Sequence, residues 1–176
     1  MLRLFPLVFL VAGLAATAQP RSVVVNGARV DSTTLARLEA RYNVRVQDGA
    51  YWYDRTSGAW GHGGGPTVGF IPAGLRLGGT LRADASRGRT SVSVNGRRLP
   101  AQDLRALEAL TGRIEPGRYW LDAQGNAGRE GGPALVNLAR LARQSRGVRR
   151  SWLTGIGSNS SGGSGYVMGR DWSVSY

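Results

Sequence analysis

The sequence predicts an α+β fold: two tandem copies of a strand–turn–helix–β-hairpin unit with small antiparallel sheets, then an amphipathic helix and a Gly/Ser-rich tail. Three observations support this prediction. The motif Ser-Val-x-Val-Asn-Gly occurs twice, beginning at Ser22 and at Ser91. In both copies a Leu-x-x-Leu-Glu segment with helical spacing follows. A Tyr-Trp-x-Asp segment that leads to a glycine then completes each copy, which indicates a duplicated structural unit.

The Asn-Gly pairs at Asn26 and Asn95 predict the first turn of each copy. Asn-Gly tolerates the positive φ angles of a two-residue hairpin turn, and each pair follows a valine-containing run that is typical of a strand. We therefore expect a strand, a tight turn and a short return strand in each copy. The return strands are predicted at Ala28 to Val30 and at Arg97 to Leu99.

A helix is predicted directly after each return strand. Asp31 or Ser32 can cap the first helix, and Pro100 suits the first turn of the second. Each helix has one apolar stripe that should face the core, made by Leu35, Leu38 and Tyr42 in the first copy and by Leu104, Leu107 and Leu110 in the second.

An aromatic β-hairpin is predicted after each helix. Alternation places Tyr51 on one face of a strand and Trp52 on the other, and Tyr119 and Trp120 repeat this arrangement. An Asp and then a Gly follow in both copies, which is typical of a tight turn with a left-handed glycine.

The ends of the chain predict export and a basic C-terminal part. Residues 1–18 have a basic start, an apolar run and the ending Ala16-Thr17-Ala18, which predicts a signal peptide, a mature N-terminus at Gln19 and a secreted or periplasmic location. No transmembrane segment is predicted in the mature chain. The further divisions are copy one at 19–66, a Gly-rich connector at 67–90, copy two at 91–133, a basic amphipathic helix at 134–150 and a Gly/Ser-rich tail at 151–176.

The charge of the chain predicts anionic partners. All 23 basic residues are Arg, against 11 acidic residues, and the net charge is +12. This excess favours a polyanionic glycan, lipopolysaccharide or an anionic lipid surface, with non-specific nucleic acid as an alternative. A spacing near three gathers several guanidinium groups on one side of the C-terminal helix, namely Arg140, Arg143, Arg146, Arg149 and Arg150. A solvated helix face that serves solubility is the alternative.

The residues that carry most enzymatic chemistry are scarce. There is no Cys and only one His, His62, so thiolate metal sites and Cys–His catalysis are excluded, and no metal or cofactor is predicted. The glycine clusters lack the Walker pattern of a phosphate loop. Paired carboxylates are the enzymatic alternative, because glycoside hydrolysis uses two of them. The candidate pairs are Asp54 with Asp122 and Glu115 with Glu130.

The motifs also resemble known groups of proteins. Val-Asn-Gly, then Leu-x-x-Leu-Glu, then the run from Gly117 to Pro133 is similar to uncharacterised secreted bacterial proteins that carry the same tandem motif. This resemblance covers Ser22 to about Leu138 and implies export and a repeated fold, with no established activity. Gly117 to Asn126 also resembles the aromatic hairpins of choline-type cell-wall-binding repeats. Those repeats are about 20 residues long and stack as a solenoid, whereas here a helix separates the hairpins.

Together these features predict an exported, non-catalytic protein that binds a polyanionic or glycan component of the cell envelope. Trp52, Trp60 and Trp120 are the candidate stacking residues for a sugar ring, and burial in the core is the alternative for each. Two other functions stay open. One is a glycan-acting hydrolase that uses the paired carboxylates, and the other is a structural or self-assembling component of the envelope.

Overall fold

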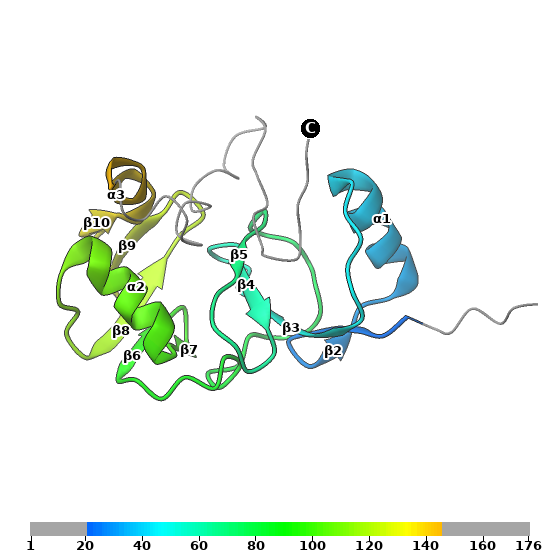
Figure 1. Cartoon of the computed structure of the whole chain (residues 1–176), viewed down its shortest axis with the longest axis horizontal. Helices are drawn as coiled ribbons and strands as arrows, with labels where there is room; N and C mark the ends of the chain where they lie inside the picture. Colours follow the sequence, from blue (N-terminus) through cyan, green and yellow to red (C-terminus); the bar gives the residue numbers. More distant parts are fainter. Residues whose placement is uncertain (1–20, 146–176) are drawn as a thin grey trace, which may run out of the picture.

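The computed structural model describes residues 21–145 and has an α+β fold made of two similar units that lie side by side (Figure 1). The predicted signal peptide, Gly/Ser-rich tail and Arg146, Arg149 and Arg150 lie outside the described residues. Each unit has one five-stranded sheet and one 11-residue helix, and a third, shorter helix follows unit two. The predicted duplication is therefore confirmed as two copies of one architecture.

Unit one consists of β1 (Val23–Val25), β2 (Ala28–Arg29), α1 (Ser32–Tyr42), β3 (Gly49–Tyr53), β4 (Ala59–His62) and β5 (Gly69–Phe70). Its sheet has the strand order β2-β1-β3-β4-β5. The pair β1–β3 is parallel and the other pairs are antiparallel, so the sheet is mixed. The parallel pair arises because β2 brings the chain back to the start of β1, and α1 with the loop after it leads to that same end, where β3 begins beside Val23.

Unit two repeats this arrangement with β6 (Val92–Val94), β7 (Arg97–Arg98), α2 (Ala101–Thr111), β8 (Gly117–Leu121), β9 (Asn126–Arg129) and β10 (Val136–Asn137). The strand order is β10-β9-β8-β6-β7, again with one parallel pair, β6–β8. The helix α3 (Leu138–Gln144) begins directly after β10, whereas unit one continues into the connector after β5. This difference decides what covers the core of each unit.

The two Asn-Gly turns form as predicted. Asn26 and Asn95 have φ angles of 50° and 48°, and the glycines that follow them have φ angles of 80° and 82°. The Asn26 side chain also pairs with β3, because its amide donates to the Tyr53 carbonyl and its oxygen accepts from the Tyr53 N–H. Asn95 makes the same two bonds with Leu121. Asn thus fixes both the turn and the strand beside it.

Helices α1 and α2 begin within one residue of the predicted starts and place one apolar stripe in the core. The predicted helix at 134–150 begins later, at Leu138, because Val136 and Asn137 form β10. Asp31 caps α1 by accepting a hydrogen bond from the Thr34 N–H. Pro100 precedes α2, which has no side-chain cap. Leu35 is buried in α1 and Leu107 in α2. No helix of the described part is long and apolar enough to span a membrane.

The two units share part of their hydrophobic core. One cluster belongs to unit one alone and contains Leu35, Tyr51, Tyr53 and Trp60. The other joins Trp52, Ala59 and Phe70 of the opposite face of sheet one to residues of unit two such as Leu99 and Leu121. The units are therefore packed against each other through this shared cluster and are not joined by the connector alone.

Candidate binding site

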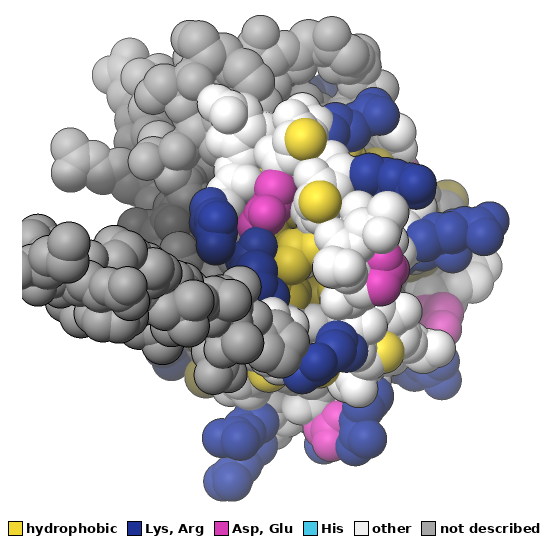
Figure 2. Space-filling view, turned by 90° about the vertical axis from the view of Figure 1, so that its right-hand side faces the viewer, with side chains coloured by type: hydrophobic (Ala, Val, Ile, Leu, Met, Phe, Trp, Pro, Cys, Tyr) yellow, Lys and Arg dark blue, Asp and Glu magenta, His cyan; other side chains and the backbone are white. Residues whose placement is uncertain are grey.

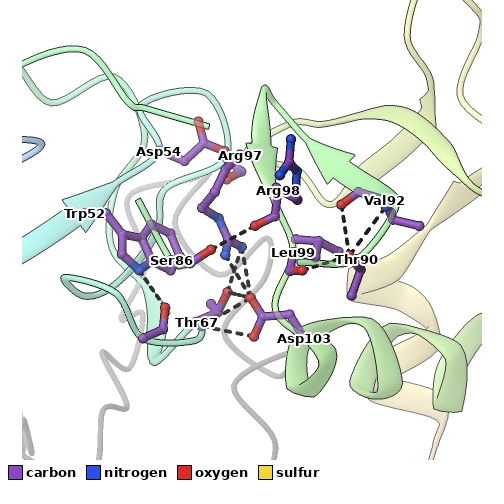
Figure 3. Close-up of polar contacts among 12 residues, drawn as sticks. Trp52, Asp54, Thr67, Ser86, Thr90, Val92, Arg97, Arg98, Leu99 and Asp103 are labelled. Atoms are coloured by element: carbon purple, nitrogen blue, oxygen red, sulfur yellow. Dashed lines mark hydrogen bonds and ion pairs between the residues drawn. The ribbon is translucent and has the colours of Figure 1, made fainter. Parts of the chain in front are cut away.

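A buried polar network joins the two units at their shared core (Figure 3). Asp103 on α2 is 0% exposed, and its carboxylate accepts two hydrogen bonds from Arg97 at 3.0 Å. The same carboxylate accepts from the backbone N–H and the hydroxyl of Thr67, at 3.0 and 2.7 Å. Since Thr67 belongs to unit one, this network fixes the position of one unit on the other.

Arg97 also contacts unit one through an aromatic ring. Its guanidinium carbon lies 4.0 Å from the centre of the Trp52 ring, which is the distance of a cation–π contact. Burial lowers the pKa of the Arg97 guanidinium, and Asp103 opposes this effect. Arginine stays charged even so, and the buried charge is balanced by the Asp103 carboxylate.

The predicted sugar-stacking residues occupy different environments. Trp52 and Trp60 are 1% and 5% exposed, so their rings lie in the core and are not open to a sugar. Trp120 is half-buried, and its indole N–H donates to the Gly132 carbonyl at 3.1 Å. Trp52 makes the equivalent bond to Gly65, so this bond belongs to the repeated fold.

The predicted carboxylate pairs are engaged elsewhere. Asp54 is buried and accepts from Ser57 and from Asn95, at 2.5 and 2.6 Å, and thereby adds a second bond between the units. Asp122 accepts from residues of its own turn. Glu115 faces Arg113, and Glu130 pairs with Arg118. Residues 21–145 contain no group of His, Asp and Glu that could hold a metal ion.

Unit two contains a large cavity where unit one is filled. The cavity has a volume of about 580 Å³ and lies among sheet two, α2, α3 and the adjoining face of unit one. The space in the core of unit one measures only about 60 Å³. Cavities that hold small ligands have volumes of roughly 300–1,000 Å³, so only the larger space is of a size to take one.

The cavity arises from two differences between the copies. In unit one, Tyr53 faces Trp60 across β3 and β4, and both rings are buried. At the same two positions of unit two, Leu121 faces Ala127. The smaller side chains leave space in front of the sheet that the aromatic rings fill in unit one.

The segment that covers the core also differs between the units. In unit one the connector packs Ile71 and Leu75 onto the core cluster. The Tyr53 hydroxyl holds this cover by donating to the Pro72 carbonyl at 2.6 Å and accepting from the Leu75 N–H at 3.2 Å. Burial raises the pKa of Tyr53 to about 12. In unit two, α3 covers the sheet instead, and Leu138 and Leu141 line the cavity.

The polar residues of the cavity lie at two places. Asp54 and Arg97 line it beside unit one, where the network described above binds both. Arg113, Glu115 and Arg129 also line it, and all three are exposed, so they mark its opening. The Arg129 guanidinium lies 5.6 Å from the centre of the Tyr119 ring.

The predicted arginine stripe is described only in part. Arg140 and Arg143 are exposed on α3, and the other three members lie outside the described residues. Figure 2 shows the molecule from the side of α1, with Lys and Arg side chains around that face and a small apolar area between them. Since the chain has no Lys, these basic side chains are arginines.

Sequence reasoning missed the buried network and the cavity, although the duplication contains a signal for both. Arg97 and Asp103 correspond to Ala28 and Thr34 of unit one, so charges appear where the other copy has none. Leu121 and Ala127 correspond to Tyr53 and Trp60. The core positions at which the two copies differ are therefore the positions that form the network and the cavity of unit two.

Comparison with known proteins finds relatives in plants. The chain is 34% identical over 113 residues to extra-large guanine nucleotide-binding protein 1 of Arabidopsis thaliana, and 28% identical over 114 residues to extra-large guanine nucleotide-binding protein 2. The matches cover 62% and 63% of this chain but only 13% of each relative. No protein-family model and no solved structure matches the chain.

These relatives correct several expectations. They are plant proteins named for guanine nucleotide binding, so the resemblance to uncharacterised secreted bacterial proteins is wrong. The predicted secreted or periplasmic location, the export signal and a function at a cell envelope conflict with the same finding. The error has a physical reason. Asn-Gly turns, apolar stripes and aromatic hairpins specify a fold, and a fold does not determine location or function.

Proposed function

We propose that the chain is a binding module that holds a small, largely apolar ligand in the cavity of unit two. The proposal rests on one observation. The core of unit one leaves a space of only about 60 Å³, whereas the same fold in unit two has a cavity of about 580 Å³. A cavity of this size exposes apolar surface that a ligand would remove from water. Its position between two packed units is also typical of ligand sites.

The names of the relatives raise guanine nucleotide binding as a different function. The matches cover only 13% of each relative, so the names of the relatives do not place a nucleotide site on this chain. We propose that residues 21–145 do not provide one. A phosphate site of the common kind needs a glycine loop that leads into a helix N-terminus. The glycine turn of unit one leads into β5 and that of unit two into β10. A triphosphate would also be a poor occupant of an apolar cavity.

A neutral fluorescent probe tests the proposal. Nile red should bind the full chain with saturable fluorescence, and the variant Leu121→Tyr/Ala127→Trp should lose this binding because it installs the residues of unit one. Arg105→Gln serves as the matched control, since Arg105 is exposed on α2 and does not line the cavity. Equal binding by the wild type and a folded, filled variant would disprove the cavity as the site. GDP should not compete with the probe.

The charge supports a second binding function. We propose that α3 contributes to weakly specific, salt-sensitive binding of a polyanion, such as an acidic glycan, an anionic lipid surface or nucleic acid. Arg140 and Arg143 are exposed on this helix, and the chain has a net charge of +12. Clustered arginines release counterions when they bind a polyanion, so retention on heparin should fall steeply with salt.

A further inference from the structure

The inner wall of the cavity has no free polar group to receive a charge. Asp54 accepts from the backbone N–H of Thr56 and from the side chains of Ser57 and Asn95. Arg97 is bound to Asp103. Ser57 and Thr67 also line this wall, and their hydroxyl groups donate to Asp54 and to Asp103. A charged ligand group placed here would lose its hydration without gaining a partner. The inner end of any ligand must therefore be apolar.

The opening, in contrast, has a cation that is free to bind. Arg129 has no acidic side chain within ion-pair distance among residues 21–145. Two other arginines do have acidic partners. Arg118, on the adjacent strand β8, is paired with Glu130, and the Arg113 guanidinium lies 3.6 Å from the Glu115 carboxylate. The Arg129 guanidinium is held over the Tyr119 ring, which orients it without neutralising it.

This cation is specific to the unit that has the cavity. The residue that faces Tyr51 in unit one is His62, whereas Arg129 faces Tyr119 in unit two. His62 packs against aromatic rings, with its centre 5.2 Å from that of Tyr51 and 6.1 Å from that of Trp60. The filled unit thus has an aromatic stack at the position where the open unit has a guanidinium.

We propose that the ligand of unit two is an amphipathic carboxylate, whose apolar body fills the cavity and whose carboxylate binds Arg129 at the opening. A single guanidinium matches a single carboxylate, because its parallel N–H groups can donate two hydrogen bonds to the two oxygens. A phosphate dianion would need more positive charge than this opening has, since Arg113 is opposed by Glu115. This inference rests on the proposed cavity function and adds the chemical class of the ligand.

The test compares three probes with the same alkyl chain: dodecanoate, dodecanol and dodecylammonium, each below its micelle-forming concentration. Competition with Nile red on the full chain measures their affinities at pH 7. Dodecanoate should bind most tightly. Arg129→Gln should weaken it by about ten- to a hundredfold, the value of one charge-assisted hydrogen-bonded pair, and should leave dodecanol unchanged. Arg105→Gln, the control on α2, should change neither.

The outcomes separate the two proposals. If dodecanoate and dodecanol compete equally, and Arg129→Gln affects neither, the cavity binds apolar ligands and the carboxylate inference is wrong. If none of the three probes competes, the proposed function fails together with the inference. If Arg129→Gln weakens dodecanol as much as dodecanoate, Arg129 acts on the shape of the opening and not on the charge, which also overturns the inference.

Discussion

The ion pair between Arg97 and Asp103 can be tested with residues that the chain itself supplies. Unit one has Ala28 and Thr34 at the matching positions, so Arg97→Ala and Asp103→Thr convert the charged contact into the uncharged one. Asp103→Thr alone leaves the Arg97 charge buried, with a side chain only 6% exposed, and removes the acceptor for Thr67. Breaking a buried pair in this way costs about 3–5 kcal/mol.

The double variant separates the charge from the packing. Arg97→Ala alone leaves the Asp103 carboxylate with only the two Thr67 donors and removes the contact with Trp52. With both charges gone, no unpaired ion remains, so the double variant should be less destabilised than the sum of the two single variants by about 1–3 kcal/mol. Urea unfolding followed by tryptophan fluorescence and by far-UV circular dichroism measures each free energy of unfolding. Additive costs, or a single-variant loss below about 1 kcal/mol, would refute the role of this pair.

Three further variants test the core of unit one and the charge on α3. Trp60→Ala should destabilise the chain by about 3–5 kcal/mol, because it opens in unit one the space that unit two already has. Urea unfolding measures this loss, and a value below about 1 kcal/mol would show that the core of unit one collapses into the space left by the ring. The pKa of Tyr53 is raised to about 12 by burial, while the unfolded chain ionises it near its reference value of 10.0. Its contribution is therefore complete below pH ~10 and falls by about 2–3 kcal/mol as the pH rises to ~12, because only the unfolded state has released the proton. Tyr53→Phe should lose this pH dependence, and an unchanged slope would assign it to other groups. Replacing Arg140 and Arg143 with Gln should leave the unfolding midpoint unchanged and lower the salt concentration that elutes the chain from heparin; unchanged elution would exclude α3 from the contact.

Much of the architecture could be predicted from local chemistry. The Asn-Gly turns, the apolar stripes of α1 and α2 and the Asp31 cap depend on residues near each other in sequence, and they form as expected. The parallel pairs β1–β3 and β6–β8 were missed because alternation along a strand reports which face is buried and not which neighbour it pairs with. The direction of pairing follows from the return strands β2 and β7, which bring the chain back to the start of β1 and β6 before each helix.

The site could not be predicted, because it depends on contacts between units. Arg97 stands in a short return strand beside Arg98, and nothing in the local sequence shows that the first is buried and the second exposed. Its burial follows from Thr67 and Trp52 of the other unit. The cavity likewise comes from Leu121 and Ala127, two ordinary apolar residues. Only a comparison of the two copies, position by position, shows that larger rings are missing there.

The replacement of Arg97 and Asp103 by Ala28 and Thr34 in unit one also limits how copies of the chain can associate. The contact between the units is heterologous, since one face of unit one meets a different face of unit two. Repeated from molecule to molecule, such a contact would extend an open filament. Unit one does not offer the arginine and aspartate that the contact uses, so unit two of another molecule cannot continue the series through it. Unit one therefore lacks the charged pair of this contact, and the asymmetry of the two copies disfavours end-to-end association of molecules through it.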